Sequence, residues 1–300
     1  MAGAAISTEE LGKQYAGSSS YALKKLSLQI MPGEVYGFLG PNGAGKSTTI
    51  RLLMNFIQPT EGQAQILGMD VVEDSVKIKR QVGYLSGEVA LFGKMTGREF
   101  LNYMADLQPP RNSKYINELA RRFQANLNVK IRDLSKGNRQ KIGLLQALMH
   151  KPKVLILDEP TSGLDPLMQE EFFAVLKETT SAGGTVFVSS HNLAEVQRMC
   201  DRVGFIRDGQ LILEQSISEI AAAAAKTFQV TFIGEVPKAE LRALKGGKAS
   251  VSGTNQVTIT MRGDLAPMFK LLANHRVAGI NQQELNLEEE FLGFYKKGRK

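Results

Sequence analysis

The chain has 300 residues, of which 43% are apolar and 22% are charged, and its formal net charge is +7. This length predicts about two domains. The composition is that of a chain that can bury a core without disulfides. Because the chain has a single cysteine, Cys200, it cannot form an intrachain disulfide. No apolar run approaches the roughly 18 residues that a bilayer requires, and Met1–Glu10 lacks a signal-peptide pattern. We therefore expect neither an integral membrane protein nor a secreted one.

The basic residues are scattered, except for a cluster at Lys296, Lys297, Arg299 and Lys300. We favour a solvated tail over a binding patch for this cluster. The sequence contains no basic stripe interleaved with aromatic residues, the pattern typical of single-stranded nucleic acid binding.

Over the first two-thirds of the chain, short apolar runs alternate with helical stretches, which predicts an α/β fold with a mainly parallel sheet. The expected elements are strands over Val35–Leu39, Val154–Leu157 and Thr185–Ser189, and a hairpin over Val203–Leu213. Between these strands, residues from about 98 to 149 form amphipathic patterns that predict an inserted helical subdomain.

We place a domain boundary after residue 215. Ser216 and Glu219 have capping-box spacing and open an alanine-rich helix. The following pattern is strand, helix, two strands, helix and strand, up to residue 284, and a last helix is expected over Leu287–Lys297. The sequence thus predicts a domain at 1–215 and a smaller α+β domain at 216–300 with the ferredoxin-like βαββαβ order.

A glycine-rich motif of the form G-x-x-x-x-G-K-[ST] follows the first apolar strand and precedes a helical stretch. Its residues, with the next one along the helix, are Gly40, Pro41, Asn42, Gly43, Ala44, Gly45, Lys46, Ser47 and Thr48. Such a loop directs backbone N–H groups at phosphate oxygens, beside a helix N-terminus whose dipole favours anions. Lys46 is expected to reach the β- and γ-phosphates, and the Ser47 hydroxyl to ligate Mg²⁺.

Asp158 and Glu159 follow the apolar run Val154–Leu157. An acid at the end of a buried strand beside a phosphate-binding loop is where a second Mg²⁺ contact belongs, so Asp158 is assigned to the metal. Glu159 is placed to polarise a water for attack on the γ-phosphate. The alternative is that both carboxylates only cap the turn at Pro160, and the presence of the phosphate-binding loop disfavours it.

At this point the chain resembles the ATP-binding subunit of ABC transporters, over about residues 5–214. The motifs occur in the order of that family: the P-loop, the signature Leu134–Gln140, the Walker B run Val154–Glu159, the D-loop Ser162–Asp165 and the switch histidine His191. The resemblance implies an ATPase that uses ATP and Mg²⁺, with Glu159, His191 and Lys46 as the catalytic residues.

The resemblance also implies a head-to-tail dimer. The signature residues Ser135, Lys136, Gly137 and Asn138 would act on the ATP held by the other subunit, and Asp165 is the site residue taken from the D-loop. Tyr15 corresponds to the aromatic residue that stacks on adenine, and His191 would hydrogen-bond the γ-phosphate.

Two segments depart from the family pattern. Lys136 stands where glycine is usual and Asn138 where glutamine is usual, but neither removes Ser135 or Gly137. In the segment that looks like the Q-loop, Val82–Glu88, the glutamine position falls on Gly87, and Glu88 follows. Glu88 is therefore a candidate for the missing oxygen ligand of Mg²⁺ or water.

The C-terminal region resembles the accessory domain of exporter subunits of the bacitracin-resistance and multidrug type. The leading hypothesis is thus an exporter subunit that powers a separate transmembrane permease, and the surface that meets the permease is expected near Leu91–Phe100. The subunit would work as a dimer with a second copy of itself or with a homologous ATPase subunit. Such a protein would be cytoplasmic and peripheral on the inner face of the cell membrane. The alternative is a soluble, non-transport ATPase of the same family that acts on the ribosome or on nucleic acid.

Overall fold

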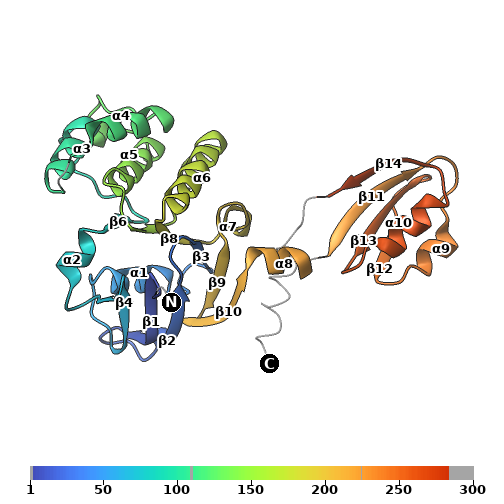
Figure 1. Ribbon diagram of the computed structural model, residues 1–300, viewed down its shortest axis with the longest axis horizontal. Helices are drawn as coiled ribbons and strands as arrows, with labels where there is room; N and C mark the ends of the chain where they lie inside the picture. The colour runs from blue at the N-terminus through green and yellow to red at the C-terminus, as the bar shows by residue number, and fades with distance from the viewer. Residues whose placement is uncertain (1–2, 109–110, 224, 284–300) are drawn as a thin grey trace. The chain divides into compact units, whose positions relative to one another are not determined.

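The computed structural model describes residues 3–108, 111–223 and 225–283, and it divides into two compact units (Figure 1). The first unit spans Met1–Gln215 and the second Ser216–Lys300. The expected helix over Leu287–Lys297 lies outside the described residues. Among the helices of the described ranges, none combines the length and the apolar character needed to cross a membrane.

The first unit is built around a six-stranded sheet that carries the strands predicted from the sequence. Their order is β10 (Gln210–Ser216), β9 (Arg202–Arg207), β3 (Val35–Leu39), β8 (Thr185–Ser190), β7 (Val154–Asp158) and β6 (Val82–Leu85). From β9 to β6 each pair of neighbours is parallel. The expected hairpin is present as β9 and β10, joined at Asp208 and Gly209, whose φ angles of 51° and 76° suit a tight turn.

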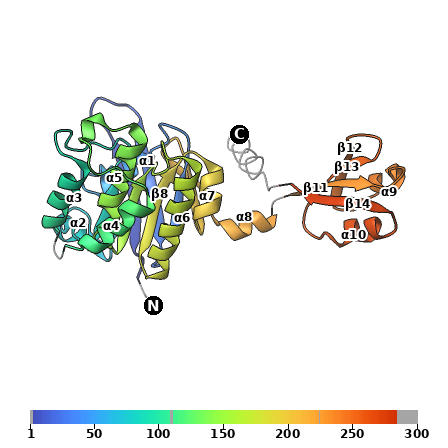
Figure 2. The same ribbon diagram turned by 90° about the horizontal axis from the view of Figure 1, so that it is seen from above.

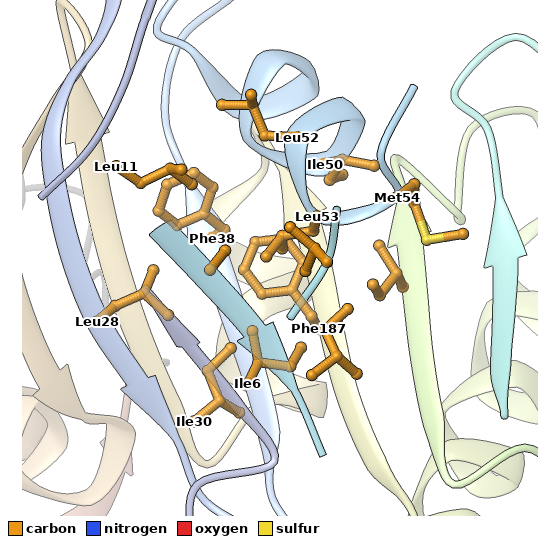
Figure 3. Close-up of a cluster of buried hydrophobic side chains, with 14 of the residues drawn as sticks. Ile6, Leu11, Leu28, Ile30, Phe38, Ile50, Leu52, Leu53, Met54 and Phe187 are labelled. Atoms are coloured by element: carbon orange, nitrogen blue, oxygen red, sulfur yellow. The ribbon is translucent and has the colours of Figure 1, made fainter. Parts of the chain in front are cut away.

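A second, four-stranded sheet in this unit was not predicted. Its order is β2 (Tyr21–Ile30), β1 (Ile6–Gln14), β4 (Glu61–Ile66) and β5 (Met69–Asp70), and every neighbouring pair is antiparallel. Helix α1 (Lys46–Leu53) contacts β2 and β4 of this sheet and β7 of the larger one. The buried cluster in Figure 3 fills the space between them and contains Ile6, Leu28, Ile50, Phe38 and Phe187.

Helices α6 (Pro166–Ser181) and α7 (Leu193–Met199) pack on the opposite face of the larger sheet. On β3, Tyr36 and Phe38 belong to the cluster on the α1 side, so Gly37 faces the other way. A Cβ on Gly37 would lie 2.8 Å from Cys200 Sγ and 2.9 Å from a Val196 methyl group, so α7 approaches the strand as closely as glycine allows.

The predicted helical subdomain lies between β6 and β7 in the chain and gathers at one side of the first unit (Figure 1). It contains α3 (Gly97–Asp106), α4 (Ser113–Arg122), the 3₁₀ turn Ile131–Asp133 and α5 (Lys136–Leu148), while the short α2 (Ser75–Lys79) precedes β6. Helix α3 begins with a capping box between Thr96 and Glu99, a feature that stabilises a helix N-terminus by about 1 kcal/mol.

In the second unit, the capping box of Ser216 and Glu219 opens α8 (Ile217–Ala223). The βαββαβ order then appears as β11 (Lys226–Phe232), α9 (Lys238–Arg242), β12 (Gly247–Val251), β13 (Gln256–Met261), α10 (Ala266–Ala273) and β14 (Val277–Gln282). The strands form an antiparallel sheet in the order β12-β13-β11-β14 (Figure 2). Apolar residues of β11 and β13 share one buried cluster with Leu241 of α9 and Met268 of α10, so both helices cover the same face.

The only cysteine, Cys200, gives a test of the packing of the first unit. Its side chain is buried, and burial raises the pKa of the thiol well above its ordinary value. We expect the native protein to react with a chromogenic disulfide reagent far more slowly than the protein in guanidinium chloride. The variant Ser20→Cys places a second thiol at an exposed position, and one of its two thiols should react at once. Equal rates for native and unfolded wild type would contradict this packing of α7 on β3.

Candidate functional site

The loop between β3 and α1 has a backbone path that requires glycine. Gly43 and Gly45 have φ angles of 80° and 112°, and a Cβ on Gly40 would lie 2.3 Å from the carbonyl oxygen of Ile206. Helix α1 begins at Lys46 with no side chain capping its N-terminus. Its first N–H groups therefore face the loop, where an anionic ligand satisfies them and the helix dipole favours it.

The Lys46 ammonium group lies over this loop. Its Nζ donates to the carbonyl oxygens of Gly40, at 2.6 Å, and Pro41, at 3.2 Å, and it stands 3.5 Å from Glu159 Oε1. The side chain is only 6% exposed, so its charge is held at the mouth of the loop. A cation in this position complements phosphate oxygens that enter the loop.

Each oxygen of the Asp158 carboxylate, at the end of β7, accepts a hydrogen bond from a serine hydroxyl group. Ser47 Oγ donates to Oδ2 at 2.8 Å, and Ser189 Oγ donates to Oδ1. Asp158 and Ser189 are paired in the register of β7 and β8, and both are buried. Ser189 was not predicted as a site residue, although its place beside Asp158 follows once these two strands are aligned.

Glu159 and His191 form a close pair beside Lys46. His191 Nδ1 and Glu159 Oε2 are 2.7 Å apart, and Glu159 is the first residue after β7. Its φ angle of 49° lies in the left-handed region, which costs a non-glycine residue about 1 kcal/mol. The Glu159 N–H donates to both the hydroxyl and the carbonyl oxygen of Ser189, which holds the residue in this conformation.

These groups line one cavity of about 720 Å³, a volume typical of small-molecule sites. Its walls come from the P-loop and the start of α1, from the ends of β6 and β7, and from His191. Of the predicted site residues it gathers Pro41, Asn42, Gly43, Gly45, Lys46, Ser47, Thr48, Glu88, Asp158, Glu159 and His191. The phosphate-binding loop, both acids and the switch histidine are thus within one chamber.

The segment after β6 brings Gly87, rather than a side chain, against Asp158. A Cβ on Gly87 would lie 3.2 Å from Asp158 Oδ2. Glu88 lines the same cavity but is exposed, one residue further from the carboxylate. At Gly87, this segment therefore brings no ligating side chain to the Asp158 carboxylate.

Tyr15 lies beside the P-loop helix, at the edge of the site. Its hydroxyl is 3.3 Å from Thr48 Oγ1, the Lys13 ammonium group is 5.7 Å from the ring centroid, and the side chain is 37% exposed. It is not among the residues that line the cavity.

The signature segment lies outside the cavity. Ser135 is the N-cap of α5 and accepts from Asn138 N at 3.3 Å, and both Ser135 and Lys136 are exposed. Gly137 lies against the D-loop, where a Cβ would approach the Gly163 carbonyl oxygen to 2.5 Å. Asp165 caps α6 by accepting from Met168 N. The described part of the first unit thus directs its signature to solvent and not to its own P-loop.

Two solved structures of similar fold are ATP-binding cassettes. A structure titled as the ATP-binding subunit of an ABC transporter aligns with a TM-score of 0.67 at 26% identity, over 72% of this chain and 91% of that one. The dimeric cassette MJ0796, a bacterial ABC transporter cassette, aligns with a TM-score of 0.66 at 25% identity, over 71% and 98%.

Sequence relatives agree with the structural ones. Residues 23–162 match the family model described as ABC transporter. The bacitracin transport ATP-binding protein BcrA of Bacillus licheniformis is 35% identical over 70% of this chain and 69% of its own, and the ABC transporter ATP-binding protein YhcH of Bacillus subtilis is 33% identical over 89% and 88%.

The probable multidrug ABC transporter ATP-binding protein YbhF of Escherichia coli is 34% identical over 75% of this chain, but the match spans only 39% of YbhF. This chain is matched by the family model, by relatives over most of their length and by the cassette fold, and it therefore belongs to the ABC transporter ATP-binding family and is an ATPase.

Proposed function

We propose that two copies of this chain, or one copy and a homologous subunit, close head to tail on two ATP molecules and thereby power a separate membrane subunit. The observation that carries the proposal is that the exposed signature segment lies outside the P-loop cavity of its own chain. The P-loop cavity is lined by the Lys46 ammonium group, two carboxylates and a histidine, while Ser135 and the N-terminus of α5 are exposed outside it. A second chain would supply the missing hydroxyl and helix end to the same phosphate.

Within one site, each residue has a role that its position supports. Lys46 would bind the β- and γ-phosphates, and the open N-terminus of α1 would add backbone donors. Glu159 would accept a proton from the attacking water. The contacts of its Oε1 with Lys46 and of its Oε2 with His191 would orient the carboxylate. His191 would contact both that carboxylate and the γ-phosphate and so fix their relative positions. Tyr15 would stack on the adenine ring, next to Thr48.

The oxygen donors at the base of the cavity fit a magnesium ion. Ser47 Oγ and Asp158 are 2.8 Å apart, and Mg²⁺ is usually held by one or two such oxygens together with water and substrate phosphates. When bound, the ion would neutralise charge on the phosphates that develops during hydrolysis. Because Gly87 has no side chain to offer, we assign the remaining protein oxygen to Glu88.

An exposed aromatic cluster around the start of the helical subdomain supports the proposal of a membrane partner. Phe92 lies 5.8 Å from Phe100 and 6.0 Å from Tyr103, measured between ring centroids, and Phe92 and Tyr103 are about half exposed. Exposed aromatic residues are enriched at protein interfaces. The names of BcrA and YbhF, bacitracin transport and multidrug, favour an exporter, and such a subunit would work on the inner face of the cell membrane.

The central role of Glu159 predicts a trapped dimer. Glu159→Gln removes the proton acceptor but keeps the shape of the side chain, so turnover should fall by about 100-fold or more while ATP still binds. Size-exclusion chromatography of this variant with Mg²⁺ and ATP should show a dimer. Adding Lys46→Ala to the variant should abolish the dimer, because it removes the phosphate contact. A monomer that still hydrolyses ATP would contradict both the role of Glu159 and the closed pair.

The assignment of Glu88 predicts a change in the magnesium requirement. Glu88→Ala should raise the Mg²⁺ concentration at half-maximal ATPase rate by about tenfold, because an oxygen near the ion is lost. Glu88→Gln, which keeps a carbonyl oxygen, should change it less. The matched control is Glu73→Ala, an exposed acid away from the cavity. An unchanged magnesium titration in Glu88→Ala would exclude this residue as a ligand, direct or through water.

A further inference from the structure

The Glu195 side chain of α7 collects three hydrogen-bond donors. Its Oε2 accepts from Thr161 Oγ1 at 2.6 Å and from Ser190 Oγ at 3.3 Å, and its Oε1 accepts from Asn192 Nδ2 at 3.3 Å. Thr161 and Ser190 are buried, at 5% and 1% exposure. A carboxylate that binds hydroxyl groups in such surroundings forms strong, charge-assisted hydrogen bonds.

Two of these donors stand next to the catalytic pair. Thr161 lies two residues after Glu159, and Ser190 immediately precedes His191. The two segments leave the adjacent strands β7 and β8, whose register ends at Asp158 and Ser189. Beyond that point, one carboxylate joins the segment that carries Glu159 to the segment that carries His191.

The helix that carries Glu195 is itself firmly anchored. Its buried residues are Leu193, Val196 and Met199. On its outer side, Arg198 pairs with Glu170 of α6, and its guanidinium group lies 5.2 Å from the centroid of the Phe173 ring. Glu195 is therefore held by packed elements on either side.

Helix capping alone does not account for this arrangement. Asn192 already caps α7, because its Oδ1 accepts from Ala194 N at 3.0 Å. The shortest bond of Glu195, at 2.6 Å, goes instead to Thr161, 34 residues away in the chain. The carboxylate thus serves a contact between segments in addition to its own helix.

We propose that Glu195 is a positioning residue of the ATPase, which holds Glu159 and His191 at the distance that hydrolysis requires. The proposal rests on the proposed function, since it assigns a catalytic purpose to the pair. Thr161 is the partner through which Glu195 acts on the Glu159 segment. Misplacing a catalytic group by a small distance lowers turnover more than substrate binding.

The test compares substitutions that break the bond with substitutions that keep it. Glu195→Ala and Thr161→Val should each lower kcat by about tenfold and leave KM for ATP within about twofold. Glu195→Gln and Thr161→Ser, which keep an acceptor and a hydroxyl group, should lose less turnover than Glu195→Ala and Thr161→Val. The double variant Glu195→Ala, Thr161→Val should be no slower than about the worse single one, because both remove the same contact.

The control is Glu73→Ala, which removes an exposed acid that is not among the residues lining the cavity and should leave kcat unchanged. Wild-type turnover in both Glu195→Ala and Thr161→Val, or losses that multiply in the double variant, would overturn the proposal. Equal losses in Glu195→Gln and Glu195→Ala would do the same.

These results are separable from the proposed function. If Glu159→Gln still forms an ATP-dependent dimer while Glu195→Ala turns over normally, only the positioning role is wrong. If Glu159→Gln forms no dimer and still hydrolyses ATP, the proposed function itself is wrong.

Discussion

The Asp158 carboxylate is the point on which the nucleotide site depends. It is 7% exposed, and a buried carboxylate is tolerated only when hydrogen bonds replace its lost hydration. Ser47 at the start of α1 and Ser189 at the end of β8 supply those bonds. The same carboxylate therefore fixes the P-loop helix, the strand that leads to Glu159 and the strand that leads to His191. The absent side chain at Gly87 lets the next segment lie against it.

Much of the fold could be predicted because its signals are local. Apolar runs of four or five residues gave the strands β3 and β7, and the second unit shows the strand and helix order expected for it. The antiparallel sheet could not be recognised from the same signals. Its strand β4, with the sequence EGQAQI, is mostly polar, and β1 contains irregularities that interrupt the alternation of buried and exposed residues. Those strands are defined by their neighbours, not by their own sequence.

In the site too, some residues could be predicted from local sequence and others could not. The P-loop is a continuous motif whose chemistry follows from its residues, and Glu159 was predicted from its place after a buried strand beside that loop. The family resemblance added His191, whose Nδ1 lies 2.7 Å from Glu159 Oε2. Ser189 and Glu195 carry no motif. Their partners Asp158 and Thr161 are 31 and 34 residues away, and only the parallel register of β7 and β8 brings them together. Likewise, the sequence identified the weak Q-loop, but only the structure shows that Gly87 faces Asp158.

The proposed closed pair requires that the exposed signature of one chain complete the P-loop site of another. To detect this contact, two Glu159→Gln proteins are mixed, one with Asn42→Cys and the other with Lys136→Cys, both at exposed positions, and a short bismaleimide is added. Because the native Cys200 is buried, the introduced thiols report the contact. We predict a cross-linked dimer in the mixture with Mg²⁺ and ATP, and little without ATP or with either protein alone. No cross-link in the ATP-bound mixture would contradict the head-to-tail arrangement.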